Sequence, residues 1–135
     1  AWQNAKTRAE SALSKNPSDM FSHYNLVTAL YYLRDYEGTV REFEAVAPDL
    51  TRRFLWYQHE PIEAYFKLGK YDRVLELADR VINDNNKSVS ELYLLKGKVY
   101  ESRGQIAEAR AEYEKALFYH KYFQPAKDAL ASLDG

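Results

Sequence analysis

Residues 91–117 read ELYLLKGKVYESRGQIAEARAEYEKAL, and this stretch decides the fold of the chain. Apolar and small side chains recur every third or fourth position on both sides of Gly104, which is the spacing of one face of an α-helix. Glycine just past a helix end commonly closes the last turn in a left-handed conformation. The stretch therefore predicts a helix, a tight turn at Gly104 and a second helix.

The same pattern recurs along the chain with a period of about one helix pair. The large apolar residue that opens each second helix falls at Trp2, Tyr36, Tyr71 and Ile106, at intervals of 34, 35 and 35 residues. The later slots of these helices hold small or apolar residues: Ala5, Thr39, Val74 and Ala109; Ala9, Phe43, Ala78 and Tyr113; Ala12, Val46, Val81 and Ala116. A period in this range predicts an array of helix pairs that bury one another's apolar faces.

Composition excludes several other classes of protein. The chain has 135 residues, 46% of them hydrophobic, no cysteine and a formal net charge of -1. No apolar run is long enough to span a membrane, and the first residues lack the charged-then-apolar pattern from which we would expect a signal peptide. The near-neutral charge argues against a nucleic-acid partner. Because no stretch alternates apolar and polar residues between turns, we predict an all-α chain.

Residues 19–46, DMFSHYNLVTALYYLRDYEGTVREFEAV, and residues 91–117 resemble the tetratricopeptide repeat (TPR). The TPR pattern has a small residue in the first helix, a tyrosine three residues later, and then alanine, an aromatic residue, alanine and proline. The resemblance implies a right-handed α-solenoid of helix-turn-helix units with a C-terminal capping helix. Four residues depart from the pattern: Arg34 stands where a turn glycine is usual, Thr39 and Val74 replace a small alanine, and Pro61 interrupts a first helix.

The period divides residues 1–135, taken as a single domain, into five parts. We expect the second helix of a truncated repeat at 1–17, repeats at 18–50, 51–87 and 88–122, and the capping helix at 123–135. The expected helices cover 1–15, 19–33, 36–47, 51–67, 70–84, 88–102, 105–120 and 124–133. Pro61 is expected to kink or divide the helix over 51–67, because proline lacks an amide donor and clashes with the preceding turn. Since Trp2 lies in a second-helix slot, we expect the chain to be part of a longer protein.

The resemblance implies a non-catalytic scaffold that binds a peptide or helix of a partner on a concave face lined by the first helix of each repeat. Aromatic residues dominate the first half of that face, and they are frequent anchors in protein interfaces. An alternative is that half of them only pack between repeats. The predicted partner-binding residues are Phe21, Tyr24, Thr28, Tyr31, Tyr32, Trp56, His59, Glu60, Glu63, Phe66, Lys67, Glu91, Leu94 and Lys98.

One subclass of TPR domains grips the C-terminal carboxylate of large chaperones with lysine, asparagine and arginine side chains. At the matching positions this chain has Tyr24, Thr28, Glu60, Glu91 and Leu95. The clamp is absent, and the two glutamates would repel a carboxylate. We therefore expect no chaperone-tail partner, and a basic or aromatic peptide is preferred.

The sequence gives little support for an enzymatic or a metal-binding function. The histidines, His23, His59 and His120, fall in different repeats, so no pair has the i, i+4 spacing of a helical metal site. No glycine-rich phosphate loop or nucleophile elbow is present. We predict no catalytic residues, no metal and no cofactor.

Two alternatives to a peptide-binding scaffold stay open. Residues 54–82, FLWYQHEPIEAYFKLGKYDRVLELADRVI, resemble the TPR segment attached to bacterial papain-like peptidases of the C39 type, which would make the chain an accessory domain of a larger enzyme. The second alternative is that the chain is a structural or oligomerising element that self-associates through the N-terminal edge at Trp2, Ala5 and Ala9. The residues leave the compartment open, with the cytoplasm favoured.

Overall fold

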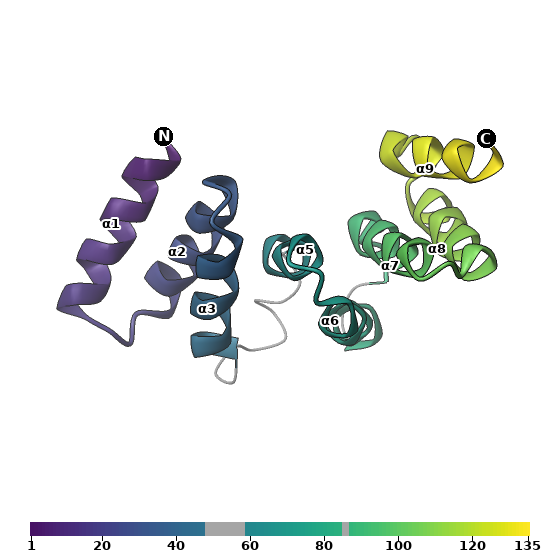
Figure 1. Ribbon diagram of the computed structural model, residues 1–135. Helices are drawn as coiled ribbons and strands as arrows, with labels where there is room; N and C mark the ends of the chain where they lie inside the picture. The colour runs from purple at the N-terminus through teal and green to yellow at the C-terminus, as the bar shows by residue number, and fades with distance from the viewer. Residues whose placement is uncertain (48–58, 85–86) are drawn as a thin grey trace. The chain divides into compact units, whose positions relative to one another are not determined.

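The computed structural model describes residues 1–47, 59–84 and 87–135, and these ranges hold eight α-helices and no β-strand. The helices, shown in Figure 1, are α1 (Trp2–Lys15), α2 (Met20–Tyr32), α3 (Tyr36–Val46), α5 (Glu60–Lys67), α6 (Tyr71–Asp84), α7 (Ser90–Ser102), α8 (Ile106–Tyr119) and α9 (Gln124–Asp134). The prediction of an all-α chain built from helix pairs is confirmed.

The chain forms two compact units, Ala1–Gly69 and Lys70–Gly135. In the first unit α1 packs on α2, α2 packs on α3, and α5 contacts both α2 and α3. In the second unit α6 packs on α7, α7 on α8, and α8 on α9. Each helix therefore buries its apolar face against its neighbours in the sequence, which is the packing of a helical repeat.

The core of the first unit alternates small and large side chains between its helices. Ala9 of α1 packs against Leu26 and Leu30 of α2, with Leu13 partly buried beside them. Phe43 of α3 lies edge-on to another aromatic ring, that of Tyr65 in α5, with ring centroids 6.3 Å apart. Small residues allow the close approach of two helices, while these rings fill the wider spaces.

The core of the second unit is centred on α8. Tyr113 is fully buried in a cluster that also contains Tyr93, Leu94, Ala109, Ala116 and Ala126. The residues of α9 that pack against this cluster are Ala129, Leu130 and Leu133, together with the buried Ala126. The closing helix thus covers an apolar face of α8 that would otherwise meet water.

Three turns in successive repeats each contain one residue in the left-handed conformation. Arg34, Gly69 and Gly104 have φ angles of 64°, 75° and 76°. At two of them the same closing bonds form, since the amides of Asp35 and Gln105 donate to the carbonyls of Leu30 and Tyr100 at 2.9 Å. Arg34 therefore adopts the glycine conformation although it carries a side chain.

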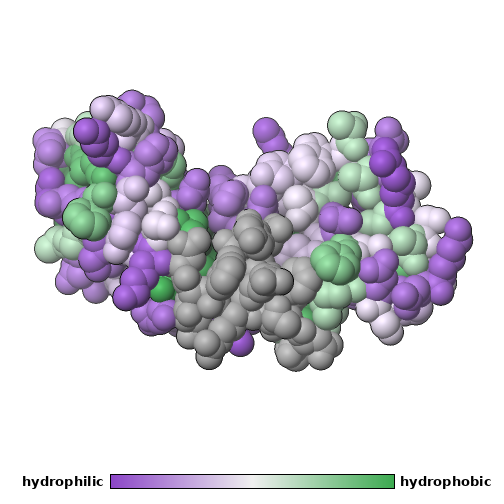
Figure 2. All heavy atoms as spheres, turned by 180° about the vertical axis from the view of Figure 1, so that it is seen from behind, coloured by the Kyte–Doolittle hydropathy of each residue, from purple (hydrophilic) through white to green (hydrophobic). Residues whose placement is uncertain are grey.

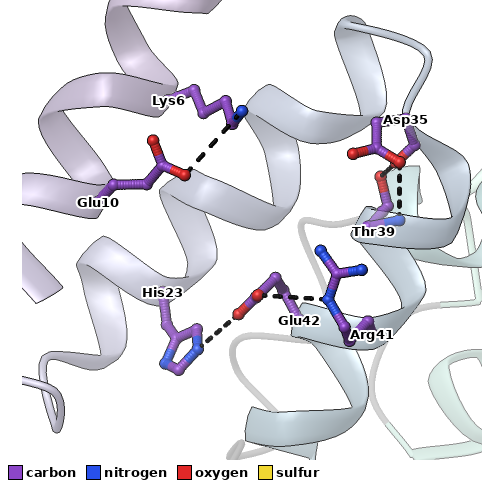
Figure 3. A network of polar contacts seen from close by, with 8 residues as sticks. Lys6, Glu10, His23, Asp35, Thr39, Arg41 and Glu42 are labelled. Atoms are coloured by element: carbon purple, nitrogen blue, oxygen red, sulfur yellow. Dashed lines mark hydrogen bonds and ion pairs between the residues drawn. The ribbon is translucent and has the colours of Figure 1, made fainter.

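Polar contacts cap the start of α3 and join it to α2 (Figure 3). The Asp35 carboxylate accepts a 2.9 Å bond from the Gly38 amide at the start of α3, and the Thr39 hydroxyl donates to the Asp35 carbonyl. The Asp35 cap satisfies an amide donor that has no partner within the helix. A separate contact joins α2 to α3, where Nε2 of His23 lies 3.0 Å from Oε2 of Glu42.

Pro61 lies in the first turn of α5, which begins at Glu60 with His59 at the N-cap. Proline is tolerated there, because the amide it lacks would have no partner within the helix. The expected helix over 51–67 is represented only from Glu60 onwards, since residues 51–58 lie outside the described part of the chain. In the described residues α5 begins beside Pro61, and the expectation that Pro61 kinks or divides a helix over 51–67 stays a prediction, because it depends on residues outside the described part of the chain.

Candidate protein-interaction site

Five predicted site residues lie on α2, and their exposure differs widely. Phe21 is 68% exposed and Tyr32 is 42% exposed, whereas Thr28 and Tyr31 are half-buried. Tyr24 is buried between helices. On this helix Phe21 and Tyr32 are therefore the aromatic side chains most accessible to a partner.

Polar contacts join the C-terminal end of α2 to α5. The Tyr32 hydroxyl donates a 3.1 Å hydrogen bond to Oε2 of Glu60. Tyr31 is hydrogen-bonded to Glu63, whose Oε2 lies 3.4 Å from Nδ1 of His59. We call these five residues the tyrosine–carboxylate cluster; they bring predicted site residues from two repeats together.

Trp2 adds an aromatic ring to this cluster from α1. Its ring stacks on that of Tyr32 with centroids 4.5 Å apart and an interplanar angle of 16°. Tyr31 meets Tyr32 edge-on at 4.9 Å. Trp2 is 43% exposed, so one end of the site presents an aromatic surface to solvent. The prediction of a binding face from first helices omits Trp2, because Trp2 lies on a second helix.

The surroundings of the cluster shift several pKa values. The hydrogen bond from His59 is the main cause that lowers the pKa of Glu63, while burial opposes it. Burial raises the pKa of Tyr31, with the Glu63 charge as a second cause. Burial and the Glu60 carboxylate likewise raise the pKa values of Tyr24 and Tyr32. All three tyrosines therefore stay protonated at neutral pH, and Tyr31 and Tyr32 remain hydrogen-bond donors to Glu63 and Glu60.

A groove of about 630 Å³ separates parts of α1 and α2 and reaches Glu60 of α5. We call it the α1–α2 groove. Its wall from α1 is formed mainly by small side chains, and its wall from α2 is formed by short polar ones. The lining residues are Trp2, Ala5, Arg8, Ala9 and Ala12 of α1, Ser22, Asn25 and Thr28 of α2, and Glu60.

The remaining predicted site residues are spread over both units. In α5, Phe66 is half-buried and Lys67 is exposed. In α7 of the second unit, Glu91 is half-buried, Lys98 is exposed, and Leu94 is buried in the core around Tyr113. The prediction for Trp56 lies outside the described residues. The described site therefore rests on α1, α2 and α5 of the first unit.

The described residues give no support for a metal site or a membrane-spanning helix. Across 1–47, 59–84 and 87–135 no group of three or more histidine, cysteine, aspartate or glutamate residues could hold a metal ion. His23 pairs with Glu42, and His120 stacks on Phe123 at 5.6 Å. None of the described helices is both long and apolar enough to cross a bilayer. Hydrophilic residues are interspersed with hydrophobic ones on the face drawn in Figure 2.

Two solved structures resemble this chain over nearly its whole length. The crystal structure of MamA matches with a TM-score of 0.82 and 17% identity, covering 98% of this chain and 76% of that chain. TTC0263, described as a thermophilic TPR protein in Thermus thermophilus, matches with a TM-score of 0.71 and 21% identity, covering 98% and 72%. No protein-family model matches the chain, and no curated protein does. The likeness shows the fold: this is a TPR-type helical repeat of the α-solenoid class, as the sequence predicts.

Proposed function

We propose that this chain is a non-catalytic interaction scaffold that binds a peptide or helix of a partner protein on the aromatic face of α2 and α5. The observation that carries the proposal is that α2 exposes the aromatic side chains of Phe21 and Tyr32, carries part of the tyrosine–carboxylate cluster and lines an open groove. TPR-type folds offer extended helical surfaces for such contacts.

The chemistry of this face favours a particular kind of peptide. Tyrosine and tryptophan provide large contact area with few rotatable bonds, so little conformational entropy is lost on binding. The carboxylates of Glu60 and Glu63 accept hydrogen bonds from the hydroxyls of Tyr32 and Tyr31, so two negative charges lie next to these aromatic side chains. A peptide with basic and aromatic side chains therefore complements the face.

Selection of peptides by the intact chain tests this proposal. A phage-displayed library of random peptides would be screened against it, and the affinities of the selected peptides measured by fluorescence anisotropy. The double variant Phe21→Ala/Tyr32→Ala is expected to weaken binding by about tenfold or more, because exposed aromatic anchors carry much of an interface's energy.

The matched control is Phe118→Ala, which removes a side chain that is 79% exposed in the second unit. It should leave the affinities unchanged, and circular dichroism should show that both variants retain their helicity. Peptides whose binding ignores Phe21 and Tyr32 but is lost with Phe118 would place the interaction surface elsewhere and refute the proposal.

The two alternative roles stay predictions. The exposed side chains of α1 are polar apart from Trp2, so α1 adds no apolar patch to the case for self-association through this edge. Light scattering over a range of concentrations tests it directly, since a self-associating chain increases in mass as concentration rises. The role as an accessory domain of a peptidase depends on the parent reading frame.

A further inference from the structure

The α1–α2 groove contains a buried carboxylate that is only half satisfied. Glu60 is 9% exposed and lines the groove. Its Oε2 accepts the hydrogen bond from Tyr32, whereas its Oε1 is buried and has no hydrogen-bond partner in the described part of the chain. A buried carboxylate oxygen without a donor is unfavourable, and a ligand that supplied one would gain the difference.

The walls of the groove suit a polypeptide that brings such a donor. The α1 side of the groove carries only the short side chains of three alanines, Ala5, Ala9 and Ala12, along much of its length. The backbone of a partner can therefore approach α1 closely. On the α2 side the Ser22 hydroxyl, whose proton is donated to Asp19, can accept from a partner amide, and Asn25 can both accept and donate. A volume of about 630 Å³ is large enough for several side chains.

The aromatic end of the groove favours a cation. Trp2 is stacked on Tyr32, and the Tyr32 hydroxyl is the group that contacts Glu60. Lysine and arginine are the side chains that combine a hydrogen-bond donor for a carboxylate with attraction to aromatic faces. A lysine or arginine side chain therefore suits both the Glu60 carboxylate and the Trp2–Tyr32 ring pair.

We propose that the α1–α2 groove binds a segment of a partner protein that inserts a lysine or arginine side chain beside the Trp2–Tyr32 pair and donates to Oε1 of Glu60. This inference rests on the proposed function and specifies the partner's chemistry. Arg8 is the other charged residue that lines the groove. It repels a second cation, so an acidic side chain or a carbonyl of the partner belongs next to it.

A double-mutant cycle on the selected peptides tests the contact. In each peptide every lysine or arginine is replaced in turn by norleucine, which removes the charge and keeps the aliphatic stem. One replacement is expected to weaken binding to the intact chain by about tenfold or more, since hydrogen bonds between charged groups are strong. On Glu60→Gln, which keeps an acceptor for Tyr32, the same replacement should change the affinity by less than about twofold.

Two further variants separate the contact from general effects. Glu63→Gln removes a carboxylate one helical turn away that does not line the groove, and it should preserve the full effect of norleucine. Ala5→Phe fills the groove without changing Glu60, and it should weaken every peptide that shows the coupling. Thermal unfolding checks that all variants fold.

The outcomes distinguish this inference from the proposed function. Peptides that depend on Phe21 and Tyr32 but show no coupling to Glu60 overturn the inference and leave the proposed function standing. Peptides that ignore Phe21, Tyr32 and Glu60 refute both. A dimer that Glu60→Gln abolishes would place a second copy of the chain in the groove and overturn the inference as well.

Discussion

Gly97 of α7 lies directly against the ring of Tyr113 of α8, and a Cβ atom on residue 97 would overlap the ring's Cδ1 and Cε1 atoms. Tyr113 cannot retreat, because its ring is fully buried and its hydroxyl donates a 2.7 Å hydrogen bond to Oε1 of Glu101. The spacing of these two helices therefore depends on the absence of a side chain at one position.

Gly97→Ala is expected to lower the free energy of unfolding by about 1–3 kcal/mol, because an added methyl group in a packed core forces side chains and backbone apart. Urea denaturation followed by circular dichroism measures the change. Lys98→Ala, an exposed substitution one residue away, should change the stability far less. Equal effects of the two substitutions would show that the contact with Tyr113 is not tight.

Arg34→Gly is expected to stabilise the chain by about 0.5 kcal/mol. It relieves a left-handed residue, which is worth about 1–2 kcal/mol, and the greater freedom of glycine in the unfolded chain offsets about 0.5–1 kcal/mol of that gain. The converse change, Gly104→Ala, should destabilise, although no atom lies within 4 Å of the new methyl group. Thermal melts of both variants test the pair, and opposite signs are required.

Glu63 makes the stability of the first unit depend on pH. Its pKa is lower in the folded chain, first because of the hydrogen bond from His59 and then because of Tyr31, whereas burial opposes the shift. In the window between the folded and unfolded pKa values the unfolded chain binds more protons. The contribution is therefore complete above the ordinary carboxyl pKa and is lost as the pH falls through the lowered value.

Urea denaturation at about pH 7 and about pH 3 measures this dependence. Glu63→Gln should lose less stability on acidification than the unchanged chain, because its amide does not titrate. Asp128→Asn, at an exposed position in α9, serves as the control. A loss in Glu63→Gln as large as in the unchanged chain would contradict the assignment.

Lys96 supports a buried carboxylate in the second unit. Its Nζ lies 2.7 Å from Oδ1 of Asp79 and 3.5 Å from Oε1 of Glu112, which is buried. Burial lowers the pKa of Lys96, but the Asp79 hydrogen bond and the two carboxylate charges together raise it above its ordinary value. Lys96 therefore stays charged in the neutral range.

Lys96→Met should destabilise the chain by about 3 kcal/mol, because it leaves the buried Glu112 with Lys115 as its one remaining salt-bridge partner among the described residues. Adding Glu112→Met should recover most of that loss, since two apolar residues replace the pair. Urea denaturation of the single and double variants gives the comparison. A double variant less stable than Lys96→Met alone would show that the charge of Glu112 is not what Lys96 compensates.

Helices, turns and period could be predicted from the residues because all three are local. The spacing of Val74, Ala78 and Val81 places them on one helical face, and all three are buried in α6. Gly69 and Gly104 mark turns because glycine adopts positive φ readily, and both do so. The start of α5 at Glu60 was harder to place, since a proline can either kink a helix or begin one.

The accessibility of the candidate site could not be predicted in the same way. Phe21, Tyr24 and Tyr32 lie on one helix and were all expected on the binding face, yet Phe21 and Tyr32 are exposed while Tyr24 is buried. Periodicity gives the direction of a side chain on its own helix. It does not say which neighbouring helix covers that side chain.

The pattern of residues was enough to predict the all-α repeat, its helix pairs and the left-handed turns at Gly69 and Gly104, but not that Arg34 would be left-handed as well. The tertiary structure was needed to see that Trp2 of α1 stacks on Tyr32, and that Glu60 of α5, which lines the α1–α2 groove, accepts the Tyr32 hydroxyl on one oxygen and has the other buried with no hydrogen-bond partner among the described residues. The physical reason is range. Helix and turn preferences act over a few residues, whereas the groove between α1 and α2 receives its buried carboxylate from α5, which lies far from both in the sequence.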